Sequence, residues 1–320
     1  MISTDEYVEF LGREYLRGYV DTGGCAVKFA VADSSSAPAL SEQLAQSGRE
    51  AGYVVAIVDA ASTRVHLMEQ IFFEVARQVD WDALAAEALR EAVTAAGYPP
   101  PGPGAPTVDA LAAHHGADAR ELKRDVDREL QQRVFRDYGM VQEFRIAMLR
   151  LCQAQFQTGQ VSEAEHAAVL DWLRGDLQQM SALKSLLIYR RIARHNARQM
   201  LYSLPHWLAR NGRAGLLLVL DIQRLCVARR PPVEERSGQY YTRLGLLDAY
   251  EVLRQLIDST DELARCCVVV IAAPELLTDE ARGLDAYQAL KFRIFDEIRD
   301  RRRDNPFSSL VRIGEEEMAL

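Results

Sequence analysis

The stretch Gly215-Leu216-Leu217-Leu218-Val219-Leu220-Asp221 decides the fold class. Five apolar residues in succession do not fit a strand with one solvent-facing side. We interpret them as a strand buried on both faces, as in the middle of a parallel sheet. Asp221 then lies at the carboxyl end of the strand, where open α/β sheets place their ligand sites. The alternative interpretation is an ordinary core strand whose final Asp begins a turn.

Three further segments, 25–32, 54–59 and 268–275, have the same apolar character and are also predicted to be strands. Helical patterns follow the first two, over about 39–51 and about 63–79, and a third covers about 246–257. Strands that alternate with helices across short links predict parallel crossovers. The fold class expected is therefore α/β, with a parallel sheet flanked by helices.

Composition narrows the functional classes. The chain has 320 residues, of which 48% are hydrophobic and 26% charged, as in a soluble globular protein, and its formal net charge of −8 excludes nucleic-acid binding by bulk charge. No apolar run is long enough to span a membrane, and the N-terminus lacks a secretory signal. The five cysteines show no paired metal spacing, which favours reduced core thiols and a cytoplasmic location.

The domain organisation follows from a change in pattern. Residues 1–97 are expected to form the first half of the α/β domain, and the Pro/Gly-rich segment 98–106 an exposed loop. Residues 107–210 have almost wholly helical patterns, which predicts a large all-α insertion. Residues 211–320 return to the α/β pattern and are expected to complete the sheet.

The segment Asp33-Ser34-Ser35-Ser36-Ala37-Pro38 lies between a strand and a helix, the architecture of a phosphate-binding loop. A Walker A loop needs glycines for its turn, a Lys for the phosphates and a Ser or Thr for Mg²⁺. Here serines replace the glycines, Ala37-Pro38 stands in place of the Lys and Ser/Thr, and Lys28 lies back in the strand. An Asp/Ser helix cap with Pro in the first turn explains these residues equally well. The candidate nucleotide-binding residues are Ser34, Ser35, Ser36, Lys28 and Asp221.

Asp221 is also the candidate Mg²⁺ ligand, because P-loop NTPases hold their magnesium with an Asp that ends a buried strand. The next residue is Ile222, where an ATP-hydrolysing enzyme of the AAA+ type carries an acid. Ala272-Ala273 ends the fourth strand without a polar residue that could sense a γ-phosphate. We therefore assign no catalytic residue.

Two arginine-rich segments are candidates for contact with nucleic acid or a partner protein. The first contains Arg190, Arg191, Arg194 and Arg198, and the second contains Arg301 and Arg302 at the end of a predicted helix, about 289–303. Arginine stripes bind phosphates, and arginine fingers act across subunit interfaces. Solvated faces, or cations that stabilise a helix C-terminus, are the simpler explanation of both runs. His114, His115 and His166 have no ligand-like neighbours in the sequence.

Residues 248–258, with the sequence Asp-Ala-Tyr-Glu-Val-Leu-Arg-Gln-Leu-Ile-Asp, are followed by Ala273-Pro274-Glu275-Leu276-Leu277 and Arg282-Gly283-Leu284. This pattern resembles the P-loop ATP-binding proteins of BREX-type phage-defence systems. The resemblance is strongest over about 201–293. It implies an AAA+ core, ATP and Mg²⁺ as ligands, and other proteins of a defence or DNA-modification system as partners, with DNA reached through the complex. Asp221 matches the Walker B Asp, whereas Ile222 and the serine loop depart from the family pattern.

Three functional hypotheses follow. The first is a degenerate P-loop subunit of a defence or DNA-modification complex, BREX-like or of the phosphorothioation type, that acts as a scaffold or weak nucleotide binder. The second is a working ATPase in which Lys28 or a partner's Arg supplies the missing charge. The third is a DNA-binding module that uses the arginine runs, whose affinity must then fall steeply with salt.

Overall fold

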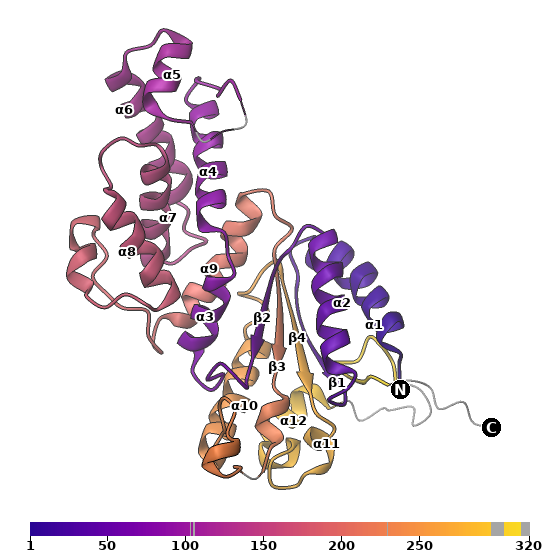
Figure 1. Ribbon diagram of the computed structural model, residues 1–320. Coiled ribbons are helices and arrows are strands. Elements are labelled where there is room, and N and C mark those ends of the chain that lie inside the picture. Colours follow the sequence, from indigo (N-terminus) through magenta and orange to yellow (C-terminus); the bar gives the residue numbers. More distant parts are fainter. Residues whose placement is uncertain (103, 105, 229, 296–303, 315–320) are drawn as a thin grey trace. The chain divides into compact units, whose positions relative to one another are not determined.

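The computed structural model describes residues 1–102, 104, 106–228, 230–295 and 304–314. The chain forms two compact units, which Figure 1 shows. The α/β unit contains Met1–Gln78 and the described residues from Arg213 onward, and the helical unit contains Val79–Gly212. The helical unit thus begins ahead of the Pro/Gly-rich segment, and α4 (Trp81–Ala95) is part of it.

The α/β unit is built on a parallel sheet of five strands in the order β2-β3-β4-β1-β5. This order is compatible with a P-loop-like fold. Because all the strands run the same way, the carboxyl ends of β1 to β4 meet at one edge of the sheet. The strands are β1 (Cys25–Val31), β2 (Val54–Asp59), β3 (Leu216–Asp221), β4 (Cys266–Ala272) and β5 (Leu310–Arg312).

Residues 216–221 form β3, and the five apolar residues of this strand are fully buried. Leu218 pairs with Ala56 of β2 on one side and with Val268 of β4 on the other, so β3 is flanked by strands on both sides. The prediction of a strand buried on both faces is therefore confirmed. A continuous apolar run is what such a position requires, because neither face of the strand meets water.

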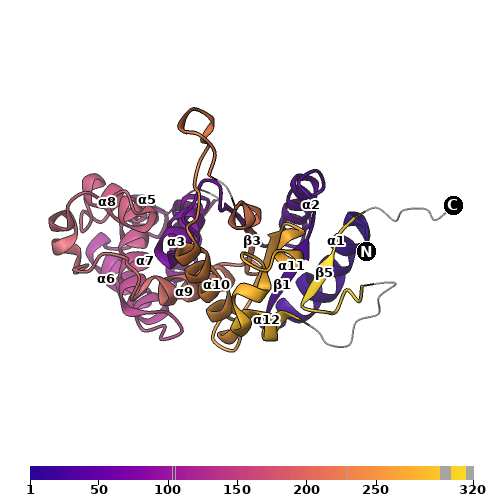
Figure 2. The ribbon, with the colours of Figure 1, turned by 90° about the horizontal axis from the view of Figure 1, so that it is seen from below.

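Helices cover both faces of the sheet (Figures 1 and 2). On one face, α1 (Thr4–Phe10), η1 (Leu11–Val20) and α2 (Ala37–Glu50) share a core with Leu217, Val219 and Val269. Gly48 lets α2 approach closely, since a Cβ there would lie 2.5 Å from a methyl group of Leu217. On this unit the helices are α1 (Thr4–Phe10), the π-helical η1 (Leu11–Val20), α2 (Ala37–Glu50), α3 (Met68–Arg77), α10 (Arg243–Asp258), α11 (Glu275–Thr278) and α12 (Gln288–Ile294), with short 3₁₀ turns η4 (Gln223–Cys226), η5 (Val233–Glu235) and η6 (Leu284–Ala286).

The strand β5 was not predicted, because three residues are too short for a recognisable pattern. It pairs with β1, and Ile313 beyond it forms a bridge to Ile2. The Arg312 guanidinium donates to both carboxylate oxygens of Asp304, which fixes the approach to the strand. The predicted helix over 289–303 is seen as α12, and residues 296–303, with Arg301 and Arg302, lie outside the described residues.

The helical unit contains no strand among its described residues. Its core gathers large buried side chains, including Trp81, Phe144 and Trp172. The helices are α4, α5 (Val108–His115), α6 (Ala119–Leu130), the π-helical η2 (Gln131–Phe135), α7 (Gln142–Gln155), α8 (Glu163–Arg174), the 3₁₀ segment η3 (Met180–Leu186) and α9 (Ala197–Arg210). Within the described part of the chain, no helix has the length and apolarity needed to cross a bilayer.

The outer strand β2 is capped by a side chain at its edge. The Gln78 amide accepts a hydrogen bond from Ile57 N at 2.9 Å and donates one to Ile57 O at 2.8 Å. These are the two bonds that a neighbouring strand would make. A paired edge is a poorer template for association with another chain.

Replacing this amide tests its role. Gln78→Ala leaves the Ile57 N–H and C=O facing water, and we expect it to lower the free energy of unfolding by about 1 kcal/mol, the net value of a hydrogen bond. Gln70→Ala is the matched control, because it truncates the same type of side chain within α3, the helix that Gln78 follows, and the described residues offer Gln70 no side-chain bond. Chemical denaturation measures both. Equal effects of the two substitutions would contradict the capping role.

Candidate functional site

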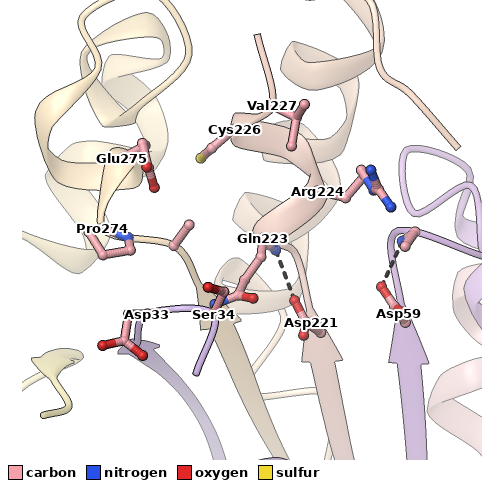
Figure 3. A pocket seen from close by; sticks show the side chains of 12 residues that line it. Asp33, Ser34, Asp59, Asp221, Gln223, Arg224, Cys226, Val227, Pro274 and Glu275 are labelled. Atoms are coloured by element: carbon pink, nitrogen blue, oxygen red, sulfur yellow. Dashed lines mark hydrogen bonds between the residues drawn. The ribbon is translucent and has the colours of Figure 1, made fainter. Parts of the chain in front are cut away.

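A cavity of about 520 Å³ lies at the carboxyl edge of the sheet. Its walls come from the segments that follow β1, β2, β3 and β4, so the parallel arrangement assembles it from distant parts of the sequence (Figure 3). This is the place where α/β sheets bind ligands. The cavity is lined by Asp33, Ser34, Asp59, Ala61, Asp221, Gln223, Arg224, Cys226, Val227, Ala273, Pro274 and Glu275.

The serine loop after β1 closes on its own aspartate. Asp33 Oδ1 accepts hydrogen bonds from Ser35 N at 3.0 Å, Ser36 N at 2.8 Å and Ser35 Oγ at 2.7 Å. The hydroxyl of Ser35, together with the amides, lowers the pKa of the Asp33 carboxyl to about 2. Ala37 N is also taken, since it donates to the Asp33 carbonyl at 3.0 Å. Three backbone donors at the start of α2, Ser35 N, Ser36 N and Ala37 N, therefore already serve Asp33.

Two further carboxylates end neighbouring strands in the same register. Asp59 of β2 pairs with Asp221 of β3, and each turns back on its own chain. Asp59 Oδ1 accepts from Ala61 N at 2.6 Å, and Asp221 Oδ1 accepts from Gln223 N at 2.9 Å. Burial raises the pKa of Asp221; the Gln223 amide opposes that rise, and the nearby Asp59 adds to it. The charged form of Asp221 is thus disfavoured by its surroundings, chiefly by burial.

Gln223 joins the ends of β3 and β1. Its side-chain amide donates to the Ala32 carbonyl at 2.8 Å, so the side chain reaches from one strand end to the other. Ile222, in the place expected for a water-orienting acid, is 1% exposed, and its N–H donates to Ile271 O at 2.8 Å. The residue after Asp221 is consequently part of the core and not of the cavity wall.

The charge of the cavity wall is strongly negative. Among the described residues, four carboxylates line it, those of Asp33, Asp59, Asp221 and Glu275, against one guanidinium, that of Arg224. Arg224 lies over the Tyr240 ring, 4.8 Å from its centroid. A triphosphate brings several negative charges of its own, so this wall opposes it unless cations accompany it.

Lys28 does not line this cavity. It is 5% exposed, and its ammonium donates to the carbonyl oxygens of Phe307 at 2.7 Å and Ser308 at 3.1 Å. The Tyr15 ring lies 4.3 Å from the same nitrogen. Burial lowers the pKa of Lys28 to about 8. Its observed role is to hold the segment before β5 against β1.

The arginines of the first basic run belong to the helical unit and do not form a helical stripe. Arg190, Arg191 and Arg194 lie in an irregular segment between η3 and α9, and only Arg198 is helical. Arg190 lies 3.7 Å from Glu143, and Arg191 donates to the Gln178 carbonyl at 2.6 Å. Of the sequence-based candidates, the structure therefore brings Ser34 and Asp221 together in the cavity wall. Ser35 and Ser36 are hydrogen-bonded to Asp33, and the other described candidates lie elsewhere.

A magnesium ion held as in a P-loop enzyme does not fit the residues present. Such a site combines one or two carboxylates, a hydroxyl at the start of the helix, and the phosphates. Here Ala37 starts α2, and the Ser35 hydroxyl is bonded to Asp33. Among the described residues, no group of three or more His, Cys, Asp or Glu side chains is arranged to hold a metal.

Sequence reasoning missed several wall residues, above all Asp33, Asp59 and Gln223. The available signal was that both 54–59 and 215–221 are apolar runs that end in Asp. Strands that are neighbours in the sheet then place the two carboxylates side by side, but the order of strands is needed to know which ones are neighbours.

Comparisons with known proteins add one match. A family model described as BREX system ATP-binding protein BrxC/D matches residues 19–316. Neither the search of curated proteins nor that of solved structures gave a match. The matched range includes every strand of the sheet and every residue of the cavity wall.

The raised pKa of Asp221 has a consequence for stability. Because the folded state holds this proton more tightly than the unfolded chain, ionisation of Asp221 destabilises the fold as pH rises above the ordinary value of 3.8. Asp221→Asn keeps the acceptor for Gln223 N and removes the charge, so we expect a higher free energy of unfolding at pH 7. The gain should vanish below about pH 3.8. Denaturant titrations at several pH values measure it, and a loss of stability at pH 7 would contradict the account.

The lowered pKa of Lys28 predicts that the free energy of unfolding depends on pH in the alkaline range. Its pKa is about 8 in the folded chain and 10.5 ordinarily, so the unfolded state binds the extra proton between these values, and stability from this group rises with pH across that window. Lys28→Met should remove this rise while keeping the apolar stem. Unfolding curves between pH 7.5 and 10.5 compare the two chains. Parallel pH profiles would show that Lys28 is not desolvated.

Proposed function

The chain belongs to the family of BREX system ATP-binding proteins BrxC/D, and on this premise we propose that it is a structural subunit of the phage-defence complex that does not hydrolyse ATP. The observation that carries the proposal is the closure of the serine loop on Asp33. A carboxylate of the same chain takes the amides that phosphate-binding loops offer to their ligand.

Three other features support the same conclusion. Lys28 is bonded to carbonyl oxygens before β5, away from the cavity wall. Ile222 is buried where a hydrolytic enzyme needs an acid. Among the described residues, the wall carries four carboxylates and one guanidinium. Loss of phosphate-binding and water-orienting groups together removes several orders of magnitude of rate from phosphoryl transfer.

In this proposal the chain contributes its folded surface to the complex and catalyses no reaction. The sheet and its helices are complete, and the cavity edge is stabilised by bonds within the chain, such as Gln223 to Ala32. Such an edge keeps its shape without nucleotide. The proposal is that partner proteins of the defence system bind this unit in one fixed conformation. In an active ATPase, nucleotide turnover would instead switch the binding surface between conformations.

Nucleotide binding is the first test. A ligand at about 100 times its Kd adds about 2.7 kcal/mol to stability, which a thermal-shift assay detects readily. We expect millimolar Mg-ATP to leave the melting temperature of the purified chain unchanged, and phosphate release to match that of Asp221→Ala. Saturable binding lost in Lys28→Ala, or turnover lost in Asp221→Ala, would establish the working ATPase instead.

Phage resistance in cells is the second readout of the same proposal. Cells that carry the complete defence system with Asp221→Ala in this chain should plate phage as poorly as cells with the unchanged chain. Cells that lack the chain are the control and should plate phage efficiently. Loss of resistance in Asp221→Ala, with normal amounts of folded protein, would mean that the cavity is chemically active.

A further inference from the structure

Two cysteines occupy paired positions where β1 and β4 begin. Cys25 is the first residue of β1, Cys266 is the first residue of β4, and the register of the two strands pairs them. Both thiols are free, and Cys25 is 6% exposed against 1% for Cys266. The pair lies at the amino edge of the sheet, whereas the cavity lies at the carboxyl edge. It is therefore separate from the candidate functional site.

The two side chains lie on the same face of the sheet. Successive residues of a strand point to opposite faces, and paired residues of parallel neighbours point to the same one. The next register pair, Ala26 and Cys267, belongs to the core that β1 and β4 share with α1, η1 and α2. Cys25 and Cys266 consequently point to the other face together, and the Cys266 thiol hydrogen-bonds with that of Cys25.

The backbone spacing of this pair suits a disulfide. Neighbouring strands lie about 4.8 Å apart, and the Cα atoms joined by a disulfide lie about 4.4–6.8 Å apart. Cys25 and Cys266 can therefore be joined by rotation of their side chains. Cys267 is adjacent in the sequence, but its Cβ points to the opposite face, and cysteines whose Cβ atoms point apart cannot be bridged without movement of the backbone.

The two thiols have different surroundings. The hydrogen bond with Cys25, together with burial, raises the pKa of Cys266 well above its ordinary value of 9.0, so Cys266 keeps its proton at neutral pH. Cys25 is the more exposed of the two and directly follows the turn at Gly23 and Gly24. Cys25 is thus the sulfur that a small oxidant reaches first, and Cys266 lies in the place of a resolving thiol.

We propose that Cys25 and Cys266 form a redox modification site, which hydrogen peroxide converts into a disulfide between β1 and β4. The Cys25 thiolate attacks one peroxide oxygen, the O–O bond breaks, and the departing hydroxide takes the proton of the Cys25 thiol and leaves as water. The sulfur of Cys266 then attacks that of the Cys25 sulfenic acid. The S–S bond forms, the S–O bond breaks, and the hydroxyl leaves with the Cys266 proton as a second water.

The disulfide would close a long loop of the chain. Residues 26–265 lie between the two cysteines, and they include β2, β3 and the helical unit. A cross-link constrains the unfolded chain more strongly as the closed loop grows longer. The oxidised chain should therefore melt several degrees above the reduced chain. This inference does not depend on the proposed absence of ATP hydrolysis.

Peptide mapping tests the site on the full, folded chain. The chain is treated with millimolar hydrogen peroxide, its remaining thiols are blocked with iodoacetamide in denaturant, and it is digested with trypsin without reduction. We expect peptides 18–28 and 266–282 to be recovered as one linked species that dithiothreitol separates. Cys267→Ser is the matched control: it should keep the link and leave Cys266 as the one cysteine of its peptide. Cys266→Ser should abolish the link.

Thermal melting is the second measurement. Peroxide should raise the melting temperatures of the unchanged chain and of Cys267→Ser, dithiothreitol should reverse both rises, and Cys25→Ser and Cys266→Ser should show no rise. Recovery of Cys25 and Cys266 as blocked thiols, or of Cys25 as a sulfinic acid, would overturn the proposal. So would a link that survives Cys266→Ser. Linked peptides without a rise in melting temperature would show that the folded sheet does not accommodate the disulfide, and would overturn it as well.

Discussion

The hydrogen bonds from the loop amides to the Asp33 carboxylate are the constraint on which the account of the α/β unit depends. The start of a helix offers few free N–H groups, and each serves one acceptor well. In this chain Ser35 N and Ser36 N already share Asp33 Oδ1. Pro38 in the first turn of α2 has no N–H to add. We infer that a phosphate seated on Ser35 N and Ser36 N would have to displace the carboxylate that these amides already serve.

The rest of the cavity is consistent with this arrangement. Asp221 and Asp59 occupy paired positions at the ends of β3 and β2, and the pKa of Asp221 is raised, chiefly by burial and further by its neighbour. An active nucleotide site needs positive charge at this edge of the sheet. Lys28 instead holds the segment before β5. The chain thus combines a family match to ATP-binding proteins with a sheet compatible with a P-loop-like fold. Under the proposal, the serine-loop amides and Lys28 serve the fold instead of a phosphate.

The sequence predicted the parallel sheet and the position of Asp221, because long apolar runs report burial directly. It could not reveal that Lys28 donates to Phe307 and Ser308, since those partners lie about 280 residues away and precede a strand too short to recognise. The arginine run after η3 was included in a helical region. The structure is irregular there because Leu187 ends η3 in a left-handed conformation, which its own residue type does not predict.

The most direct test of the central claim is an NMR titration of the Ser35 and Ser36 amide signals with Mg-ATP. If Asp33 keeps these amides, their chemical shifts stay constant as the nucleotide reaches millimolar concentration. Downfield shifts of both signals that saturate with added nucleotide would show a phosphate in place of the carboxylate, and would contradict the account.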